Sequence, residues 1–406
     1  MKTGYDLGSG EPAATAPAAG RQGRAPMYLN ITQSLRKRLR EGVWAPGARL
    51  PTLHVLANEF KVSTSTIRCA LRVLEKEGCV YQVPDVGAFV HPTNPINAAV
   101  RTTVAVSMID IGGPFEMSIV RGVVHACRER NWDLQVYDAN HDAQIEAGNL
   151  ARLTGSGSRG ALVMPIGNNA NLEQLVKLKI SGFPVVLVDR GIIGLNVDVV
   201  ESDNQKGAFV ATEHLIQHGH RQVFMLTDPI LPVPETSILA RVQGFEKALT
   251  ANGIQTARNS MVWIDPEMSA RAVREGRRWL AGYEAALPFL KSSSLPVGIF
   301  TLNDYAAWGV VQACRALSLR IPEDVSIISF DDSDITRTLD VSVVAQRPDL
   351  IGRRAVELLE RRLKPKGMEL PPEHEYVEVE LVQRGSVANL RQACPEQLSG
   401  SPQPAH

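Results

Sequence analysis

The chain has 406 residues, of which 44% are hydrophobic and 21% charged, and its formal net charge is zero. This composition predicts a globular protein of two or three domains and excludes a largely disordered or fibrous chain. Five scattered cysteines without a CxxC pair argue against a disulfide framework or a zinc site and favour a reducing compartment. Because we find neither a signal-like segment nor an apolar run of about 18 residues, we expect a cytoplasmic protein that does not enter a membrane.

Both ends of the chain have the composition of disordered tails. Residues 1–26 are rich in Gly, Ala and Pro and contain few large apolar side chains. Residues 388–406 end in a similar Ser, Gly and Pro sequence. Such segments cannot bury enough apolar surface to fold, so we expect both to be disordered.

Residues 27–92 carry the pattern of three short helices. In the first, apolar residues recur every four positions from Ile31 to Leu39, and the opposite face is basic. The second is expected at residues 52–60. The third begins at Ser63, whose hydroxyl makes it a good N-cap. The three helices are close enough in sequence to pack as one small domain.

Two short strands follow these helices, at residues 79–83 and 87–90, with a turn at Pro84-Asp85. Three helices and a hairpin predict a winged helix-turn-helix, a DNA-binding module whose third helix reads the major groove. The domain holds nine Lys or Arg residues and five acids, which gives about +4 within a neutral chain. The alternative is a mildly basic helical module without a nucleic-acid partner.

Residues 28–90 resemble the GntR (gluconate repressor) family of DNA-binding domains. The matching stretches are Gly47-Ala-Arg49-Leu50-Pro51-Thr52, Leu56-Ala57 with Val62-Ser63, Thr66-Ile67-Arg68-Cys-Ala70-Leu71, Leu74-Glu75, Glu77-Gly78 and Gly87-Ala-Phe-Val90. The resemblance implies that double-stranded operator DNA is the partner. It also implies a set of DNA-facing residues: Arg49, His54, Ser63, Thr64, Ser65, Thr66, Arg68 and, at the wing, Gly87.

Three positions depart from that family. Leu53-His54 stands where the family often has Glu-Arg, and residues 64–66 stand where it often has Arg-Thr-Thr. The wing, which is usually basic, reads Pro84-Asp85-Val86 here. Because two or three cationic contacts are missing, we expect weaker or less salt-dependent DNA binding and an operator that cannot be taken from relatives.

Residues 93–102 form the expected linker, and the prolines of His91-Pro-Thr-Asn-Pro95 favour an extended chain. Strands and helices then alternate to residue 387. The expected strands are 103–109, 133–137, 160–164, 184–190, 222–226, 261–264, 298–301 and 325–330. The expected helices are 117–130, 145–153, 172–180, 206–218, 241–252, 269–290, 305–317 and 350–363. This alternation predicts two doubly wound α/β lobes with a cleft between them: about 103–200 plus 346–387, and about 201–345.

The strand that begins at Val325 is apolar until it ends at Asp331. In open α/β sheets, ligands bind outside the carboxyl ends of the strands, so Asp331 is expected at the mouth of the cleft. The alternative is that Asp331 only caps the next turn or helix. Other polar or aromatic residues also follow predicted strands, or open a helix in the case of Arg241: Phe115, Asp189, Arg190, Arg241 and Asn303. This set suits a sugar, because carboxylates and amides accept hydroxyl protons, Arg donates paired hydrogen bonds, and an aromatic ring covers an apolar face.

Residues 103–387 resemble the ligand-binding core of the lactose/galactose repressor family, which is similar to periplasmic sugar-binding proteins. The matching stretches are Pro114-Phe115 with Ile119-Val-Arg-Gly122, Asp203-Asn204 with Gly207, His214-Leu215, Gly219-His220-Arg221, Arg241-Val-Gln-Gly244-Phe245, Asn303-Asp304-Tyr-Ala-Ala, Ile321-Pro-Glu-Asp-Val-Ser-Ile, Phe330-Asp331-Asp332-Ser333 and Gly352-Arg-Arg-Ala-Val-Glu-Leu-Leu359. The resemblance implies ligand contacts at Asp189, Arg241, Asn303, Asp331 and Phe115. The family's aromatic after residues 261–264 is hard to place, with Trp263 as either its equivalent or a core residue. Residues 265–295 are longer than the family pattern.

Three other patterns have simpler structural explanations. Residues 155–160 fit GxGxxG but precede a strand, whereas a nucleotide fingerprint follows one. His218 and His220 flank Gly219 in a turn without a neighbouring acid or Cys, so we expect no metal there. The pairs Arg353-Arg354 and Arg361-Arg362 are interpreted as a solvated helix face. We expect no cofactor.

Together these features predict a dimeric transcription regulator, most simply a repressor, whose binding to an operator is controlled by a small ligand such as a sugar between the lobes. Two alternatives remain at this point. One is a carbohydrate-acting enzyme that uses the cleft carboxylates. The other is a soluble sugar-binding protein without regulatory DNA binding. Against the enzyme, this architecture more often only binds its ligand, and no nucleophile with an adjacent base is evident. The missing signal segment and the basic N-terminal module count against the second alternative.

Overall fold

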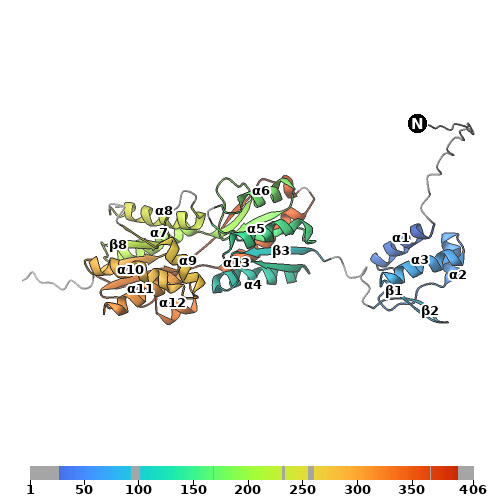
Figure 1. Cartoon of the computed structure of the whole chain (residues 1–406), viewed down its shortest axis with the longest axis horizontal. Helices are drawn as coiled ribbons and strands as arrows, with labels where there is room; N and C mark the ends of the chain where they lie inside the picture. The colour runs from blue at the N-terminus through green and yellow to red at the C-terminus, as the bar shows by residue number, and fades with distance from the viewer. Residues whose placement is uncertain are drawn as a thin grey trace, which may run out of the picture. The chain divides into compact units, whose positions relative to one another are not determined.

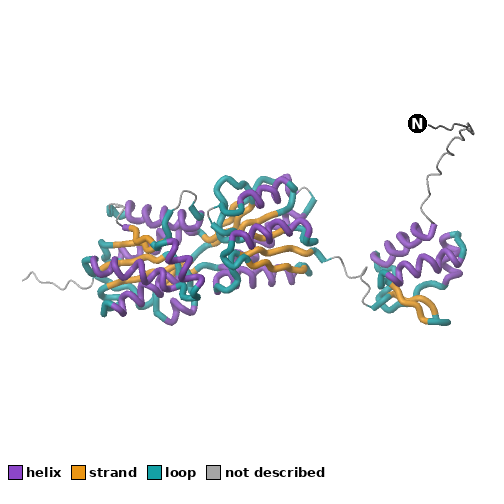
Figure 2. Tube along the Cα trace, viewed as in Figure 1, coloured by secondary structure: helices purple, strands orange, loops and turns teal. Residues whose placement is uncertain are grey.

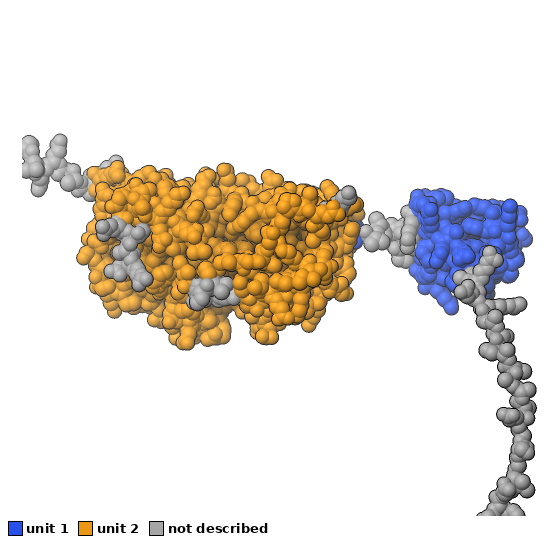
Figure 3. All heavy atoms as spheres, turned by 90° about the horizontal axis from the view of Figure 1, so that it is seen from above, with its two compact units in different colours: residues 1–101 blue, residues 102–406 orange. Residues whose placement is uncertain are grey.

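The computed structural model describes residues 27–92, 101–167, 169–230, 234–254, 260–365 and 367–391. The chain forms two compact units, residues 1–101 and 102–406, which Figure 3 colours separately. The expected N-terminal tail, most of the expected linker and most of the expected C-terminal tail lie outside the described residues. Within the described ranges, no helix is both long and apolar enough to cross a membrane.

The first unit has the three helices and the hairpin that the sequence predicted. Helices α1 (Met27–Arg40), α2 (Leu53–Phe60) and α3 (Thr64–Lys76) precede the antiparallel strands β1 (Val80–Val83) and β2 (Gly87–Val90). The apolar faces of all three helices meet in one core that includes Leu35, Leu56 and Ile67. The hairpin adds Val80 and Val90 to this core, so the helices and the wing form a single packed domain.

The second unit contains two six-stranded sheets, each covered by helices on both faces (Figures 1 and 2). We call the sheet in the order β13-β7-β6-β5-β3-β4 and its helices the first lobe. The sheet in the order β14-β12-β11-β10-β8-β9 and its helices form the second lobe. Two mostly parallel sheets, each covered on both faces, agree with the predicted fold class.

In the first lobe every strand pairing is parallel. The strands are β3 (Thr103–Met108), β4 (Asp133–Asp138), β5 (Ala161–Val163), β6 (Val185–Val188), β7 (Asp198–Ser202) and β13 (His374–Val377). Helices α4 (Pro114–Glu129) and α13 (Pro348–Leu363) cover one face, and α5 (Ala143–Arg152) and α6 (Leu172–Ile180) cover the other. Successive residues of β3 alternate between these two cores, as a strand buried on both sides requires.

The second lobe repeats this plan with one antiparallel edge. Its strands are β8 (Val223–Thr227), β9 (Met261–Trp263), β10 (Val297–Thr301), β11 (Val325–Phe330), β12 (Ser342–Ala345) and β14 (Glu380–Val382). Its helices are α7 (Asn204–Gln217) and α8 (Thr236–Ala251) on one face, α10 (Trp279–Ser292) and α11 (Asp304–Ala316) on the other, and the smaller α9 (Pro266–Arg274) and α12 (Asp334–Thr338). The antiparallel strand is β14, which pairs with β12.

The structure divides the lobes differently from the sequence at the C-terminal end. We expected residues 346–387 to stay in the first lobe, but β14 completes the sheet of the second. We expected residues 388–391 in the disordered tail, but they pack against the second lobe. The Ala388 N–H donates to Ser326 Oγ at 2.9 Å, and the Leu390 N–H donates to the His218 carbonyl at 2.8 Å. The chain therefore crosses between the lobes three times, after β7, after β12 and after β13.

The predicted long helix at residues 269–290 is two helices. Helix α9 ends before Gly276, which has a φ of +65°, and α10 begins at Trp279. A left-handed backbone at this position ends the helix, and glycine adopts it without the steric cost that a side chain adds. Four strands, β7, β12, β13 and β14, were not predicted.

Candidate ligand cleft and DNA-binding surface

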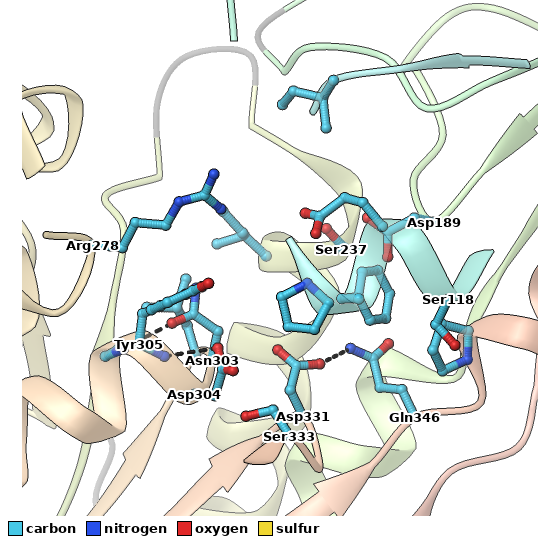
Figure 4. Close-up of a pocket in the computed structure, with 18 of the residues that line it drawn as sticks. Ser118, Asp189, Ser237, Arg278, Asn303, Asp304, Tyr305, Asp331, Ser333 and Gln346 are labelled. Atoms are coloured by element: carbon cyan, nitrogen blue, oxygen red, sulfur yellow. Dashed lines mark hydrogen bonds between the residues drawn. The ribbon is translucent and has the colours of Figure 1, made fainter. Parts of the chain in front are cut away.

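A cavity of about 640 Å³ lies at the carboxyl ends of strands from both lobes (Figure 4). Its wall includes every residue that the sequence singled out for a ligand: Phe115, Asp189, Arg190, Arg241, Asn303 and Asp331. These residues come from five separate parts of the chain. The rule that ligands bind beyond the strand ends therefore located one continuous cavity.

Asp189 and Asp331 occupy matching positions in the two lobes. Asp189 follows β6 and has a φ of +67°, and its N–H donates to the Val200 carbonyl at 2.9 Å. Asp331 follows β11 and has a φ of +73°, and its N–H donates to the Val344 carbonyl at 3.1 Å. Aspartate tolerates this left-handed backbone better than most residues, and the turn directs the chain out of the sheet at the cavity.

Asp331 is not a helix cap, contrary to the simpler interpretation of its position. Helix α12 is capped by Ser333, whose Oγ accepts from the Ile335 N–H at 3.2 Å. The Asp331 carboxylate instead accepts from Gln346 Nε2 at 2.5 Å. Loss of hydration and, to a smaller extent, the charge of Asp304 raise the pKa of Asp331 to about 7, against the opposing effect of Arg241.

Asp189 has a different electrostatic environment. It is only 3% exposed and accepts from Arg190 Nη2 at 2.9 Å. Arg190 Nη1 also contacts Glu235 Oε2 at 2.5 Å, just before α8 of the second lobe. A second cross-lobe ion pair joins Arg278 to Asp110. Arg190 therefore lines the cavity, but its guanidinium is already paired with two carboxylates of the protein.

Arg241 and Asn303 are also held by the protein. Arg241 lies inside α8, rather than at its start as expected, and donates to Asn204 Oδ1 at 2.8 Å and to the Leu302 carbonyl at 2.6 Å. Its guanidinium stacks 3.9 Å from the ring centre of Phe330, and its Nη2 has no acceptor among the described residues. The Asn303 Oδ1 caps α11 by accepting from the Ala306 N–H at 2.9 Å. Both side chains are thus pre-positioned at the cavity wall.

Several cavity residues were missed by the sequence reasoning: Glu116, Asp228, Ser237, Arg278, Tyr305 and Gln346. Asp228 directly follows β8 and Gln346 directly follows β12, so the strand-end rule could have found them had it been applied to Asp228 and had β12 been predicted. Arg278 lies in the break between α9 and α10, inside the stretch predicted as one helix. No local signal distinguishes Ser237 from other helical serines.

The remaining sequence features have structural explanations. Trp263 is on β9, is 45% exposed and does not line the cavity. His220 is fully buried, and among the described residues no cluster of His, Cys, Asp or Glu could hold a metal. Arg362, expected on a solvated face, is buried instead and makes a bidentate ion pair with Asp198 at 2.6 Å.

Most of the predicted DNA-facing residues lie at the start of α3 or at the hairpin, and His54 lies on α2. His54, Ser63, Ser65 and Arg68 are exposed, and Thr64 and Thr66 are partly exposed. Ser63 also caps α3, since its Oγ accepts from the Thr66 N–H at 3.3 Å.

Arg49 and Gly87 meet at the hairpin. The Arg49 guanidinium donates to the Val86 carbonyl, and a Cβ at position 87 would lie 3.1 Å from Arg49 Nε. The φ of Gly87 is +138°, which also disfavours a side chain. The glycine thus permits Arg49 to lie close against the wing. An exposed cation is held there at the edge of the domain.

Each unit contains a segment that matches the model of a known protein family. Residues 27–90 match the model for bacterial regulatory proteins of the gntR family, and residues 212–387 match a periplasmic binding protein-like domain. An arabinose metabolism transcriptional repressor from Geobacillus stearothermophilus is 26% identical over 353 residues, 85% of this chain and 93% of that protein. The HTH-type transcriptional repressor PurR of Histophilus somni is 27% identical over 297 residues, 72% of this chain and 84% of that protein.

A solved structure extends the likeness to both lobes. A LacI family transcriptional regulator from Enterococcus faecium with bound ribose aligns with a TM-score of 0.58 and 25% identity, over 71% of this chain and 99% of that chain. All three of these similar proteins are transcription regulators rather than enzymes.

Proposed function

From its gntR-family DNA-binding domain and its periplasmic binding protein-like domain, we infer that this chain is a DNA-binding transcription regulator controlled by a small-molecule effector. We propose further that it represses transcription and that its effector is a sugar or a sugar derivative. The observation that carries this proposal is the convergence of six predicted ligand residues on one cavity within a chain that also carries the DNA-binding domain.

The DNA half of the proposal assigns base and phosphate contacts to the start of α3. Small hydroxyl side chains and Arg68 are exposed there, and the helix N-terminus itself favours phosphate. Arg49 and the wing contact the flanking backbone. A homodimer presents two such helices to an inverted repeat, as helix-turn-helix proteins do.

The effector half assigns hydroxyl recognition to Asp189, Asn303 and Asp331, guanidinium donation to Arg241 and ring stacking to Phe115. Two similar proteins support the choice of a sugar: one is named for arabinose metabolism and the other was solved with ribose. A buried polar wall also gives selectivity, because a wrong ligand leaves its groups unpaired.

The three chain crossings connect the two lobes and allow a ligand to change their arrangement. A ligand that contacts both lobes favours their closed arrangement, in which the pairs Arg190–Glu235 and Arg278–Asp110 form. Closure of the lobes then changes the spacing of the two DNA-binding domains in the dimer. The effect on operator affinity is limited by the difference in ligand affinity between the two states.

The first test is binding of the full chain to the DNA upstream of its own gene, measured by fluorescence anisotropy at about 50 and 200 mM salt. Pentoses and hexoses are then added singly. We expect salt-sensitive binding that one sugar weakens. Absence of binding to any fragment, in a protein that sugars still stabilise against heat, would refute the operator-binding role of residues 27–92.

A pair of variants tests the DNA contacts. Arg68→Ala is expected to weaken operator binding by about tenfold or more, since Arg contacts to bases are worth about 1–3 kcal/mol. Lys76→Ala removes the same charge from the other end of α3 and serves as the matched control. Equal losses in both variants would indicate a general electrostatic effect and contradict the assigned orientation of α3.

A further inference from the structure

The cleft contains more acid than the protein's own cations neutralise. Eight of the side chains that line it are carboxylates and only five are guanidiniums. Arg190 pairs with both Asp189 and Glu235. Two arginines pair with Asp332. Asp349 is exposed at the start of α13, where solvent can hydrate it.

Four carboxylates of the cleft remain without an ion pair to any described residue: Glu116, Asp228, Asp304 and Asp331. The other guanidiniums are not free to neutralise them. Arg278 is paired with Asp110, and Arg121 is exposed. Arg241 donates to Asn204 and to a backbone carbonyl, so it acts on Asp331 only through space.

These four groups hold their negative charges at a cost. Burial raises the pKa of each of them, to about 6 for Asp228, where the charge of Glu235 adds to the effect, and to about 7 for Asp331. Asp304 is only 4% exposed and lies close enough to Asp331 for its charge to raise that pKa. A positive charge placed beside them would relieve both the burial and the mutual repulsion.

A neutral group in the same wall also lacks a partner. Gln346 Oε1 is buried and has no hydrogen-bond partner among the described residues. Gln346 lines the cavity, and its Nε2 donates to Asp331 (Figure 4). Buried acceptors are rarely left unpaired in proteins, so the position indicates a hydrogen-bond donor on the ligand. Phe115 and Tyr305 add aromatic faces, which accept both apolar ring faces and cations.

We propose that the effector is a hydroxylated ring compound that carries a protonated amine, seated against Asp304 and Asp331. This inference rests on the proposed function, because it names the chemical class of that effector. The hydroxyl groups of the ligand are bound by Gln346, Asn303 and Arg241. A phosphorylated or carboxylated sugar is disfavoured by the same four carboxylates that attract the amine.

The test compares matched sugars on the full chain. Glucosamine, galactosamine and mannosamine are each measured beside the parent hexose, the N-acetyl derivative and the 6-phosphate, by calorimetry and by thermal shift. We expect one amine to bind at least about tenfold more tightly than its parent and its N-acetyl form, as a charge-assisted hydrogen bond would give. Equal or tighter binding of a parent hexose or of a phosphate overturns the proposal.

Operator binding, measured in parallel, separates this proposal from the proposed function. If no compound binds but salt-sensitive operator binding persists, the amine proposal is overturned and the regulator stands. If an amine binds but no operator is found, the amine proposal is supported and the DNA-binding function fails.

A variant tests whether Asp331 is the carboxylate that binds the amine. Asp331→Asn should remove the preference for the amine over its parent hexose, whereas Glu173→Gln, on the exposed surface of α6, should leave it unchanged.

The protons released on binding give an independent test. At about pH 6.5, calorimetry in two buffers of different ionisation enthalpy should detect proton release, because Asp331 is partly protonated before the cation binds. The groups that face Asp331 are Asp304, Arg241, Gln346 and Asp189. Proton release that persists in Asp331→Asn would overturn the assignment to this carboxylate.

Discussion

The two lobes place an aspartate at the same point of their sheets but give it opposite electrostatic surroundings. Asp189 and Asp331 both follow a buried parallel strand, both have a left-handed backbone, and both donate their N–H to the neighbouring strand. Arg190 neutralises Asp189, whereas Asp331 faces a second carboxylate and has only an amide as a direct partner. The repeated fold therefore determines where each aspartate lies, and a few neighbouring residues determine its charge and its partners. In the first lobe the carboxylate anchors an ion-pair network, and in the second it is available to a ligand.

The largest test of this contrast is removal of the neutralising cation. Arg190→Met leaves Asp189 and Glu235 without their shared partner, and Asp189 is almost fully buried. We expect the free energy of unfolding to fall by about 3–5 kcal/mol, because loss of one partner leaves an uncompensated buried charge. Urea unfolding at neutral pH measures it. The control is Arg337→Met, which should cost below about 1 kcal/mol, because the Arg337 side chain is 55% exposed and Asp332 keeps its second partner, Arg384.

The second test uses the same substitution in each lobe. The pKa of Asp331 is about 7 in the folded state, above its ordinary value of 3.8. Between pH 3.8 and pH 7 the folded protein therefore holds a proton on this carboxyl that the unfolded chain has lost. Stability from this group is therefore greatest at low pH and is lost as pH rises toward 7. Asp331→Asn should remove that loss and raise the free energy of unfolding by about 2 kcal/mol at pH 8, with little change near pH 4.

Asp189→Asn should behave in the opposite way. It breaks a buried ion pair, so we expect it to destabilise the protein at pH 8 by about 2 kcal/mol or more. Thermal or urea unfolding of both variants across this pH range gives the comparison. Destabilisation by both substitutions at pH 8 would contradict the idea that the two aspartates have different surroundings.

The strand-end aspartates were predictable because they depend on local sequence. A run of apolar residues that stops at a polar one marks both the strand and its end, and this rule found Asp189, Asn303 and Asp331. The same rule failed where the strand was not recognised. Strand β12 is only four residues long, so Gln346, the direct partner of Asp331, was missed with it.

Features that depend on distant residues were not predictable. Strand β7 carries Asp198 and Glu201 and does not look apolar, although all five of its residues are buried. It is tolerated in the sheet because Arg362, 164 positions away, pairs with Asp198. For the same reason Arg362 was assigned to a solvated face. Strand β14 likewise joins the second lobe through pairing with β12, which no local pattern indicates.

A third test compares the two ion pairs that join the lobes. Arg190 pairs with two carboxylates, Asp189 and Glu235, whereas Arg278 pairs with Asp110 alone among the described residues. We expect Arg278→Met to lower the free energy of unfolding by only about 1–2 kcal/mol, because Asp110 keeps the hydrogen bond from the Gly112 N–H and lies 3.5 Å from His141. It should also weaken effector binding several-fold, because the closed arrangement loses a contact. Calorimetry on the variant measures this effect. Unchanged affinity would show that this pair does not contribute to closure.

The smallest expected effect tests the local role of the residue beside this acidic turn. Ser333 caps α12 through its Oγ and forms a capping box with Thr336, so Ser333→Ala should cost about 1 kcal/mol of unfolding free energy. The Ser333 side chain also hydrogen-bonds Asp304 and opposes the rise in the pKa of that buried carboxyl, so the cost should be larger at pH 8, where Asp304 is charged, than at pH 5. Ser333→Thr, which keeps the hydroxyl, should recover most of it at both pH values. A cost that is equal at the two pH values would show that Ser333 acts only as a cap and does not contribute to the charge balance around Asp331.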